Sequence, residues 1–443
     1  MNTIPIGDPR WLDAALRIGK SLCAEAIWYE DRCTFIGRSQ DEADEQTLIV
    51  TPTAESLGSE LYGGTAGVSL FLAHLAAMTG DASVRRTALG AIRHALHRPL
   101  PRAAHPIGFY SGSLGIAFVA TQVGQLLSIP EIAEAGLALA ALTADKLTVP
   151  ASEPVPLDII SGAAGGILAF LTIARSAGSD SRAERLQRAA IWLGENLCQR
   201  AERSADGQWL WRGTAMSDPN QNPQGLALPM TGYSHGAAGI ALALLELYAV
   251  SAQQQFLDGF LGAVVFESHW FGPSQMNWPD LRSVVEGTDP ASLTVFGTTW
   301  CHGAPGILLS RLRAQTLMPS LAGMLAADIA AGIKTTSQAL DARRTGPRQD
   351  GTLCHGGAGF GDILLTCGLL LSQESLVRQA ERVGNELLGE EMPGARYHTG
   401  TPSGGPNPSL LVGTAGIGLF YLRLHSPQRI PSILVPPHGA GSM

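Results

Sequence analysis

The stretch 236–250, GAAGIALALLELYAV, opens with a Gly-x-x-Gly pair and continues as an apolar run that only Glu246 interrupts. The same pattern, a glycine pair followed by apolar residues, occurs seven times along the chain. The pairs begin at Gly64, Gly112, Gly162, Gly236, Gly303, Gly356 and Gly413. Such regular repetition indicates an array of similar structural units, each of which buries its apolar face against its neighbours.

Two kinds of helix alternate in this array. The runs after the glycine pairs are apolar on nearly all faces, which indicates helices packed on both sides. Stretches such as 181–200 and 373–391 lie between the runs, carry one charged face and are typical of outer helices. The sequence therefore predicts an all-α protein, a closed α/α toroid of seven inner and seven outer helices. An open solenoid is the alternative, but no polar capping repeat is visible at either end, which favours closure.

The glycine pairs admit two interpretations. Glycine has no Cβ, so it permits a tight turn into the inner helix and close approach of neighbouring backbones. Alternatively, the pairs would leave N–H groups of the helix N-terminus pointing into the cavity, where partial positive charge collects. For most of the pairs we favour the packing role.

Composition restricts the function. The chain has 443 residues, 45% of them apolar, and a net charge of −8 without a basic run, which argues against nucleic-acid binding. The N-terminal segment has no signal-peptide core, and the longest apolar runs are too short to span a membrane. Six cysteines scattered over the chain do not form a disulfide framework. We therefore expect a soluble, cytoplasmic protein.

Chemically versatile residues stand at or just before the glycine pairs of four repeats. They are Asp158, His235, Cys301 with His302, and Cys354 with His355. If the pairs mark equivalent helix ends, repeat symmetry brings these side chains to one rim of the central cavity. Lone buried Cys and His residues usually only pack and hydrogen-bond. Two Cys-His-Gly motifs in the same register instead favour a shared site.

Two cysteines and one histidine would suit zinc with one coordination position left open, as in catalytic sites. A thiol bound at that position would lose its proton near neutral pH. The residues alone leave open whether His302 is an acid/base group, a substrate contact or a metal ligand. His235 suits acid/base chemistry with Asp158 as its orienting carboxylate. Asp158 as a helix cap before Gly162 is the alternative.

The motifs SHG (234–236), WCHGAPGI (300–307) and LCHGGAG (353–359), together with the glycine pairs, resemble the LanC-like lanthionine synthetase cyclases. The resemblance covers about residues 60–425 and implies a single LanC-like cyclase domain, 1–443, with an N-terminal extension and a short C-terminal tail. It implies zinc held by Cys301, Cys354 and His355. His235 would then be the acid/base residue, Asp158 its partner, and His302 a second candidate proton donor.

Membership of this family implies Michael addition of peptide cysteine thiols to dehydroalanine or dehydrobutyrine, which forms thioether rings. Stand-alone cyclases often carry an aromatic residue and an arginine where this chain has His302 and Gly297. The segments NWPDLR (277–282) and WCHGAPGI are more similar to the cyclase half of the fused, LanM-type synthetases. No dehydratase half is visible in the sequence, so the resemblance implies a separate dehydratase and a dehydrated precursor peptide as partners.

Three other functions were considered. A LanC-like enzyme could add a small thiol such as glutathione to dehydroamino acids. A non-catalytic zinc-bearing scaffold could bind a peptide, although the presence of His235 and Asp158 argues against it. A glycosidase on the same fold would need two opposed carboxylates, whereas the repeats offer thiols and imidazoles.

Overall fold

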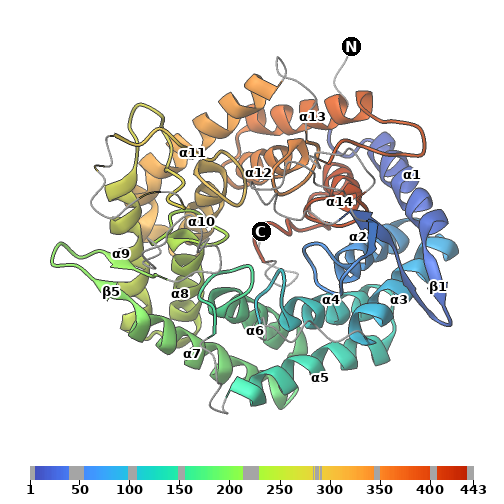
Figure 1. Cartoon of the computed structure of the whole chain (residues 1–443), viewed down its shortest axis with the longest axis horizontal. Helices are drawn as coiled ribbons and strands as arrows, with labels where there is room; N and C mark the ends of the chain where they lie inside the picture. The colour runs from blue at the N-terminus through green and yellow to red at the C-terminus, as the bar shows by residue number, and fades with distance from the viewer. Residues whose placement is uncertain are drawn as a thin grey trace.

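The computed structural model describes residues 5–38, 54–97, 107–147, 155–212, 229–282, 284, 289, 292–343, 350–399 and 407–436. These ranges contain fourteen α-helices arranged as two concentric rings (Figure 1). The inner helices are α2 (Thr65–Thr79), α4 (Ser113–Leu126), α6 (Ala163–Ala177), α8 (Ala237–Ser251), α10 (Ala304–Leu317), α12 (Gly357–Leu370) and α14 (Thr414–His425). The outer helices are α1 (Pro9–Glu25), α3 (Ala82–His97), α5 (Pro130–Leu147), α7 (Arg182–Arg200), α9 (Gln254–Trp270), α11 (Ala322–Arg343) and α13 (Glu374–Gly389).

The inner ring is closed. Each inner helix packs against the next one, and α14 packs against α2. The predicted all-α toroid is therefore confirmed. Six outer helices directly follow the inner helix that they cover, but the seventh does not. Helix α1, from the segment assigned above to an N-terminal extension, packs on α14 and completes the outer ring.

Hydrophobic patterning explains which helices lie inside. On α8 every residue from Ala237 to Leu247 is buried, and the buried carboxylate of Glu246 is paired with Arg313 at 2.8 Å. On the outer helix α13 the main apolar contacts are spaced three or four residues apart, so only one face is buried. These contacts come from Leu376, Ala380, Val383 and Leu387. An all-round apolar helix needs neighbours on every side, which the inner ring provides.

The second glycine of each pair lies against the turn that precedes its own helix. In all seven pairs, a Cβ at this position would stand 2.0 to 2.2 Å from the carbonyl oxygen six residues earlier, as at Gly165 against Ile159. The carbonyls of the turn also accept the first N–H groups of the helix; Ala163 donates to Pro156 and Ala164 to Leu157. These N–H groups therefore do not point into the cavity, and the packing interpretation of the glycines holds.

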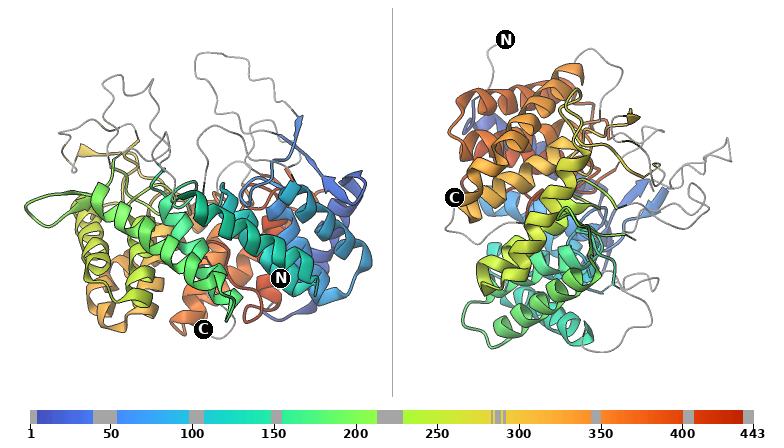
Figure 2. Two further views of the ribbon diagram at one scale, coloured as in Figure 1. Left: turned by 90° about the horizontal axis from the view of Figure 1, so that it is seen from below. Right: turned by 90° about the vertical axis from the view of Figure 1, so that its left-hand side faces the viewer.

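Short strands make up the remaining regular structure. Antiparallel pairs join β1 (Ile27–Tyr29) with β2 (Arg32–Thr34), β3 (Ile36–Arg38) with β4 (Ala54–Ser56), and β5 (Glu202–Arg203) with β6 (Trp209–Leu210). A 3-10 helix, η2 (Pro319–Leu321), links α10 to α11. The N-terminal strands rise from one face of the helical ring (Figure 2). Among the described residues, no helix is both long enough and apolar enough to cross a membrane.

The segment after α14 turns into the middle of the ring (Figure 1). Its backbone is held by inward-facing side chains: the Tyr110 hydroxyl donates to the carbonyl of Ile433 at 2.8 Å, and the Trp300 indole N–H donates to that of Leu434 at 2.9 Å. Ile433 and Leu434 are buried. The C-terminal segment thus contributes to the core of the ring.

Candidate metal centre

The turns that precede the seven inner helices are joined into a closed circuit of backbone hydrogen bonds. Each turn donates one N–H to the carbonyl of a neighbouring turn at 2.8 to 3.2 Å. The bonds run Tyr62→Tyr110, Tyr110→Ile160, Ile159→Ser234, Ser234→Cys301, Trp300→Cys354, Cys354→Leu411 and Leu411→Tyr62. Five of the seven donors stand two residues before the first glycine of a pair, and the other two, Ile159 and Trp300, stand three residues before it. The circuit therefore holds the backbones of both cysteines at the same rim.

Cys301, Cys354 and His355 meet at this rim. Their candidate ligand atoms, two sulfurs and one ring nitrogen, all lie within 4.8 Å of one another. The Cys354 Sγ is 3.5 Å from the His355 Nε2. Both cysteines are buried and His355 is half-buried. His302, although it follows Cys301 directly, lies outside this group.

The two thiols and the imidazole shift one another's pKa values, because they are close together and largely buried. The hydrogen bond from Cys354 holds the pKa of Cys301 well below its ordinary value, although burial acts in the opposite direction. Burial raises the pKa of the Cys354 thiol well above its ordinary value. Burial alone would lower the pKa of His355, but its contact with the Cys301 sulfur raises it. Two thiols and an imidazole, without a carboxylate in the group, fit zinc better than magnesium or calcium.

Two hydroxyl groups contact the sulfurs. The Tyr62 hydroxyl donates to the Cys354 Sγ at 3.0 Å, and the Thr299 Oγ1 lies 3.1 Å from the Cys301 Sγ. Neither residue belongs to the candidate site predicted from the sequence. The available signal for Tyr62 was its register, because it stands two residues before Gly64, as Cys354 stands two before Gly356.

Asp158 and His235 form a hydrogen-bonded pair, as the sequence predicted they could. The His235 Nδ1 lies 2.8 Å from the Asp158 Oδ2. The other carboxylate oxygen accepts the backbone N–H of Ser161 at 2.8 Å and its hydroxyl at 3.0 Å. Asp158 therefore stabilises the turn before α6 and holds the imidazole of His235. It does not cap the helix, because the N-cap of α6 is Gly162 and no side chain caps that end.

The charge of Asp158 is stabilised in spite of its complete burial. Burial is the largest effect and favours the neutral acid, but the hydrogen bonds from His235 and Ser161 outweigh it and lower the pKa. With the Nδ1 proton directed at this carboxylate, the Nε2 of His235 is the nitrogen free to exchange a proton with a substrate.

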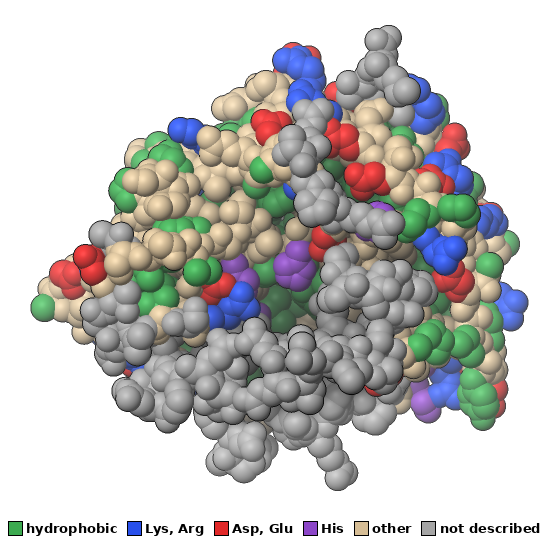
Figure 3. All heavy atoms as spheres, turned by 45° about the horizontal axis from the view of Figure 1, so that its top comes forward, with side chains coloured by type: hydrophobic (Ala, Val, Ile, Leu, Met, Phe, Trp, Pro, Cys, Tyr) green, Lys and Arg blue, Asp and Glu red, His purple; other side chains and the backbone are tan. Residues whose placement is uncertain are grey.

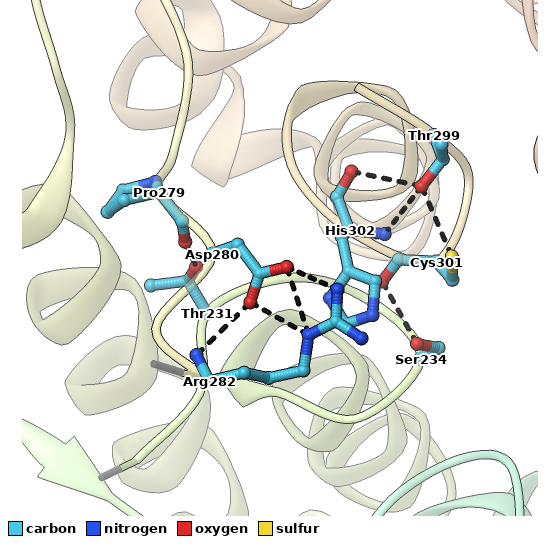
Figure 4. Close-up of polar contacts among 8 residues, drawn as sticks. All are labelled: Thr231, Ser234, Pro279, Asp280, Arg282, Thr299, Cys301 and His302. Atoms are coloured by element: carbon cyan, nitrogen blue, oxygen red, sulfur yellow. Dashed lines mark hydrogen bonds and ion pairs between the residues drawn. The ribbon is translucent and has the colours of Figure 1, made fainter. Parts of the chain in front are cut away.

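His302 lies between the metal group and a charged pair. Its ring stacks near that of His235, with ring centroids 6.0 Å apart. Figure 4 shows Asp280 and Arg282 beside the His302 ring. The two residues form an ion pair at 2.5 Å. Burial lowers the pKa of His302, which keeps its imidazole neutral near pH 7. The sequence analysis quoted the segment of Asp280 and Arg282 as a motif without assigning a role to either residue.

Histidine side chains gather around a hollow on one face of the protein. Figure 3 shows them with hydrophobic side chains at the depth of the hollow and charged side chains beside it. At the rim, residues from four separate turns provide a candidate cation-binding group, an imidazole–carboxylate pair and a second imidazole. Such a site can bind a thiol and transfer protons near neutral pH.

Comparison with known proteins gives a family and a fold. The family model described as lanthionine synthetase C-like protein matches residues 55–435. A solved structure of a nisin cyclase is similar at 17% sequence identity, with a TM-score of 0.63, over 84% of this chain and 90% of that chain. An α-mannanase of glycoside hydrolase family 76 from Bacteroides thetaiotaomicron is similar at 12% identity, with a TM-score of 0.48, over 95% and 96% of the two chains. No curated protein matches the chain in sequence.

Proposed function

The chain belongs to the lanthionine synthetase C-like family, and we propose that it is a zinc-dependent lanthipeptide cyclase. It would add cysteine thiols of a peptide to dehydroalanine or dehydrobutyrine residues and so form lanthionine and methyllanthionine rings. One observation carries the proposal: the buried group of Cys301, Cys354 and His355 shares a rim with the His235–Asp158 pair.

In this proposal Cys301, Cys354 and His355 hold the zinc ion. A zinc ion bound there supplies a positive charge that lowers the pKa of a substrate thiol, which is otherwise about 8.5. In this proposal the peptide approaches the group from the hollow at the rim. Ligands rich in sulfur keep an incoming thiolate nucleophilic, which suits addition to an alkene better than hydrolysis.

The reaction needs one proton to be returned. The substrate sulfur forms a bond to the β-carbon of the dehydroamino acid, and the π-electron pair moves toward the α-carbon and its carbonyl. A neutral imidazole takes up the thiol proton, and the resulting imidazolium returns a proton to the α-carbon, so the protons balance. We assign this uptake and return to His235, through its Nε2, or to His302. Asp158 keeps His235 in the tautomer that presents Nε2 to the substrate.

The partners follow from this chemistry. Dehydroamino acids arise by elimination of water from serine and threonine, which we assign to a separate dehydratase acting on the same precursor peptide. A reducing, cytoplasmic location is part of the proposal, because thiolate ligands must stay unoxidised. All six cysteines of the chain are free thiols in the structure.

The test is to measure zinc content and then to follow loss of free thiol in a dehydrated peptide that contains cysteine. Wild type should carry about one zinc ion and consume the thiol, whereas Cys354→Ala should do neither. Cys367→Ala is the matched control, because Cys367 is a buried free thiol on α12, outside the metal group. His235→Ala should keep its zinc and lose about 10²–10⁴-fold in rate.

Other outcomes would contradict the proposal. Wild type without zinc would refute the metal assignment, and equal thiol loss in wild type and Cys354→Ala would refute the mechanism. Addition of glutathione but not of the peptide cysteine would favour the small-thiol function instead.

A further inference from the structure

Each sulfur of the metal group has one hydroxyl group in contact with it. The shorter of these contacts joins the Tyr62 hydroxyl to the Cys354 Sγ at 3.0 Å, and the other joins Thr299 to Cys301 at 3.1 Å. Cys354 is almost completely buried. A buried sulfur cannot obtain a hydrogen bond from bulk water, so the protein has to supply the donor.

Tyr62 is held in place by the backbone circuit. Its N–H donates to Tyr110 at 2.9 Å and its carbonyl accepts from Leu411 at 3.0 Å. The carbonyl of Leu411 in turn accepts from the N–H of Cys354 at 2.8 Å. Three turns from different repeats therefore fix the relative positions of the backbones that carry the phenol and the sulfur.

The direction of this hydrogen bond is determined by the chemistry. A thiolate has no proton, so it can only accept. An ordinary phenol, with a pKa of about 10, keeps its proton near pH 7. The hydroxyl therefore remains a donor whenever Cys354 is deprotonated.

We propose that Tyr62 is a positioning residue of the zinc centre, whose hydroxyl orients the Cys354 sulfur and withdraws negative charge from it. This inference rests on the proposed function, since it assumes zinc on Cys301, Cys354 and His355. Hydrogen bonds to metal ligands orient them and tune the metal, and their loss typically weakens metal binding. A sulfur that donates less charge leaves the metal more positive, which favours the thiolate form of a bound substrate.

The arrangement is repeated on the second sulfur. The Thr299 Oγ1 accepts the backbone N–H of His302 at 3.2 Å, and its proton can go to the His302 carbonyl at 3.5 Å or to the Cys301 Sγ at 3.1 Å. A deprotonated Cys301 can only accept in this contact. Thr299 belongs to the same turn as Cys301, whereas Tyr62 reaches Cys354 from another repeat.

The decisive variant is Tyr62→Phe, which removes the hydroxyl and keeps the ring. Tyr110→Phe is the matched control, because Tyr110 occupies the same register in the next repeat but its hydroxyl donates to the carbonyl of Ile433. Two properties are measured in each protein: the zinc dissociation constant, by competition with a chelator, and the sulfur-to-cobalt charge-transfer band of the cobalt-substituted protein.

Tyr62→Phe should bind zinc about 10- to 100-fold more weakly, the range expected for loss of a hydrogen bond to a ligand. Its charge-transfer band should move to longer wavelength, because the sulfur lone pairs rise in energy without the donor. Tyr110→Phe should change neither property. An unchanged affinity and band in Tyr62→Phe, with zinc present in wild type, would overturn the inference and leave the proposed function intact.

Two further outcomes distinguish a failure of the proposed function from a failure of this inference. Absence of zinc from wild type would refute the proposed function itself, and with it this inference. If Tyr62→Phe does not fold, Thr299→Val tests the same effect on the Cys301 sulfur. The cobalt band of that variant should also move to longer wavelength, and an unchanged band would count against hydroxyl tuning of the centre.

Discussion

Two tetrapeptides of nearly the same sequence begin neighbouring inner helices, yet their histidines lie in different places. In the segment 353–356, LCHG, the His355 Nε2 lies 3.5 Å from the Cys354 Sγ and belongs to the metal group. In the segment 300–303, WCHG, only Cys301 belongs to that group. His302 lies near His235 instead, with ring centroids 6.0 Å apart.

The two turns differ in how they close. The first N–H of α12, from Gly357, donates directly to the carbonyl of Asp350 at 2.9 Å. The corresponding groups of the other turn are the N–H of Ala304 and the carbonyl of Gly297. Between them lies the side-chain amide of Asn277, which accepts from Ala304 at 2.7 Å and donates to Gly297 at 3.0 Å.

The amide separates the Ala304 N–H from the Gly297 carbonyl, and the backbone conformation of this turn differs from that of the other. Gly303 has φ of +82°, whereas Gly356 has φ of −116°. A Cβ on Gly303 would also stand 1.9 Å from the Gly297 oxygen. We infer that Asn277, rather than the tetrapeptide, determines where His302 points. The shared Cys-His-Gly sequence therefore places its histidine differently in the two turns, one of which contains a side chain from outside it.

The largest effect expected from this comparison is on zinc affinity. His355→Ala should weaken zinc binding by about 1000-fold, since zinc-binding energies of roughly 10–16 kcal/mol are shared among a few ligands. His302→Ala, its counterpart in the other tetrapeptide, should keep about one zinc ion per chain. Chelator competition on both variants measures this, and zinc loss in His302→Ala would abolish the distinction between the two histidines.

Removal of the inserted amide should have the next largest effect. Asn277→Ala leaves the buried Ala304 N–H and Gly297 carbonyl without partners, which should lower the free energy of unfolding by about 3 kcal/mol. Asn385→Ala is the control, because Asn385 is half-buried on α13 and donates to the carbonyl of Glu381 one turn earlier. Urea denaturation compares the two variants. Equal, small losses would show that the turn closes without Asn277.

His235 directly precedes its glycine pair, as His302 and His355 do, but it is hydrogen-bonded to the carboxylate of Asp158. Asp158→Asn should lower the free energy of unfolding by about 2 kcal/mol at pH 6, the value typical of a hydrogen bond to a charged group. The pKa of Asp158 is lower in the folded protein. Its stabilisation is therefore complete above the unfolded pKa of about 3.9 and is lost as the pH falls through the folded pKa.

Denaturation of wild type and Asp158→Asn between pH 6 and the lowest pH at which both stay folded measures this difference. The gap between the two proteins should shrink as the pH falls below about 4. A gap that grows with acidity would mean that Asp158 is protonated in the native protein, and its role as an anionic partner of His235 would be wrong.

The ring and the convergence of its polar residues could be predicted, because both follow from the positions of residues relative to the glycine pairs. Apolar runs after glycine pairs mark the inner helices, and repeat symmetry brings residues at the same offset, such as Cys301 and Cys354, to the same rim. The role of α1 could not be predicted, since the helix that covers α14 comes from the opposite end of the chain.

The neighbours of the metal group could not be predicted either. Tyr62 contacts a residue from another repeat, and Asn277 contacts the turn before α10 from earlier in the same connection. Both contacts depend on side-chain direction rather than on spacing along the chain. A register comparison brings Tyr62 to the correct rim without showing that its hydroxyl reaches Cys354. Asn277 has no fixed position relative to a glycine pair, because it lies in the irregular connection between α9 and α10, well before the turn that precedes α10.

The smallest effect concerns the residue in which the two tetrapeptides differ, Trp300 against Leu353. The Trp300 indole N–H donates to Leu434 in the C-terminal segment, and its ring meets Tyr110 edge to face with centroids 4.9 Å apart. Trp300→Phe keeps an aromatic ring but leaves the Leu434 carbonyl without this donor. It should therefore lower the free energy of unfolding by about 1–2 kcal/mol. Zinc content should stay at the wild-type level, because Cys301 is held by the backbone circuit; loss of zinc would instead mean that the indole positions Cys301.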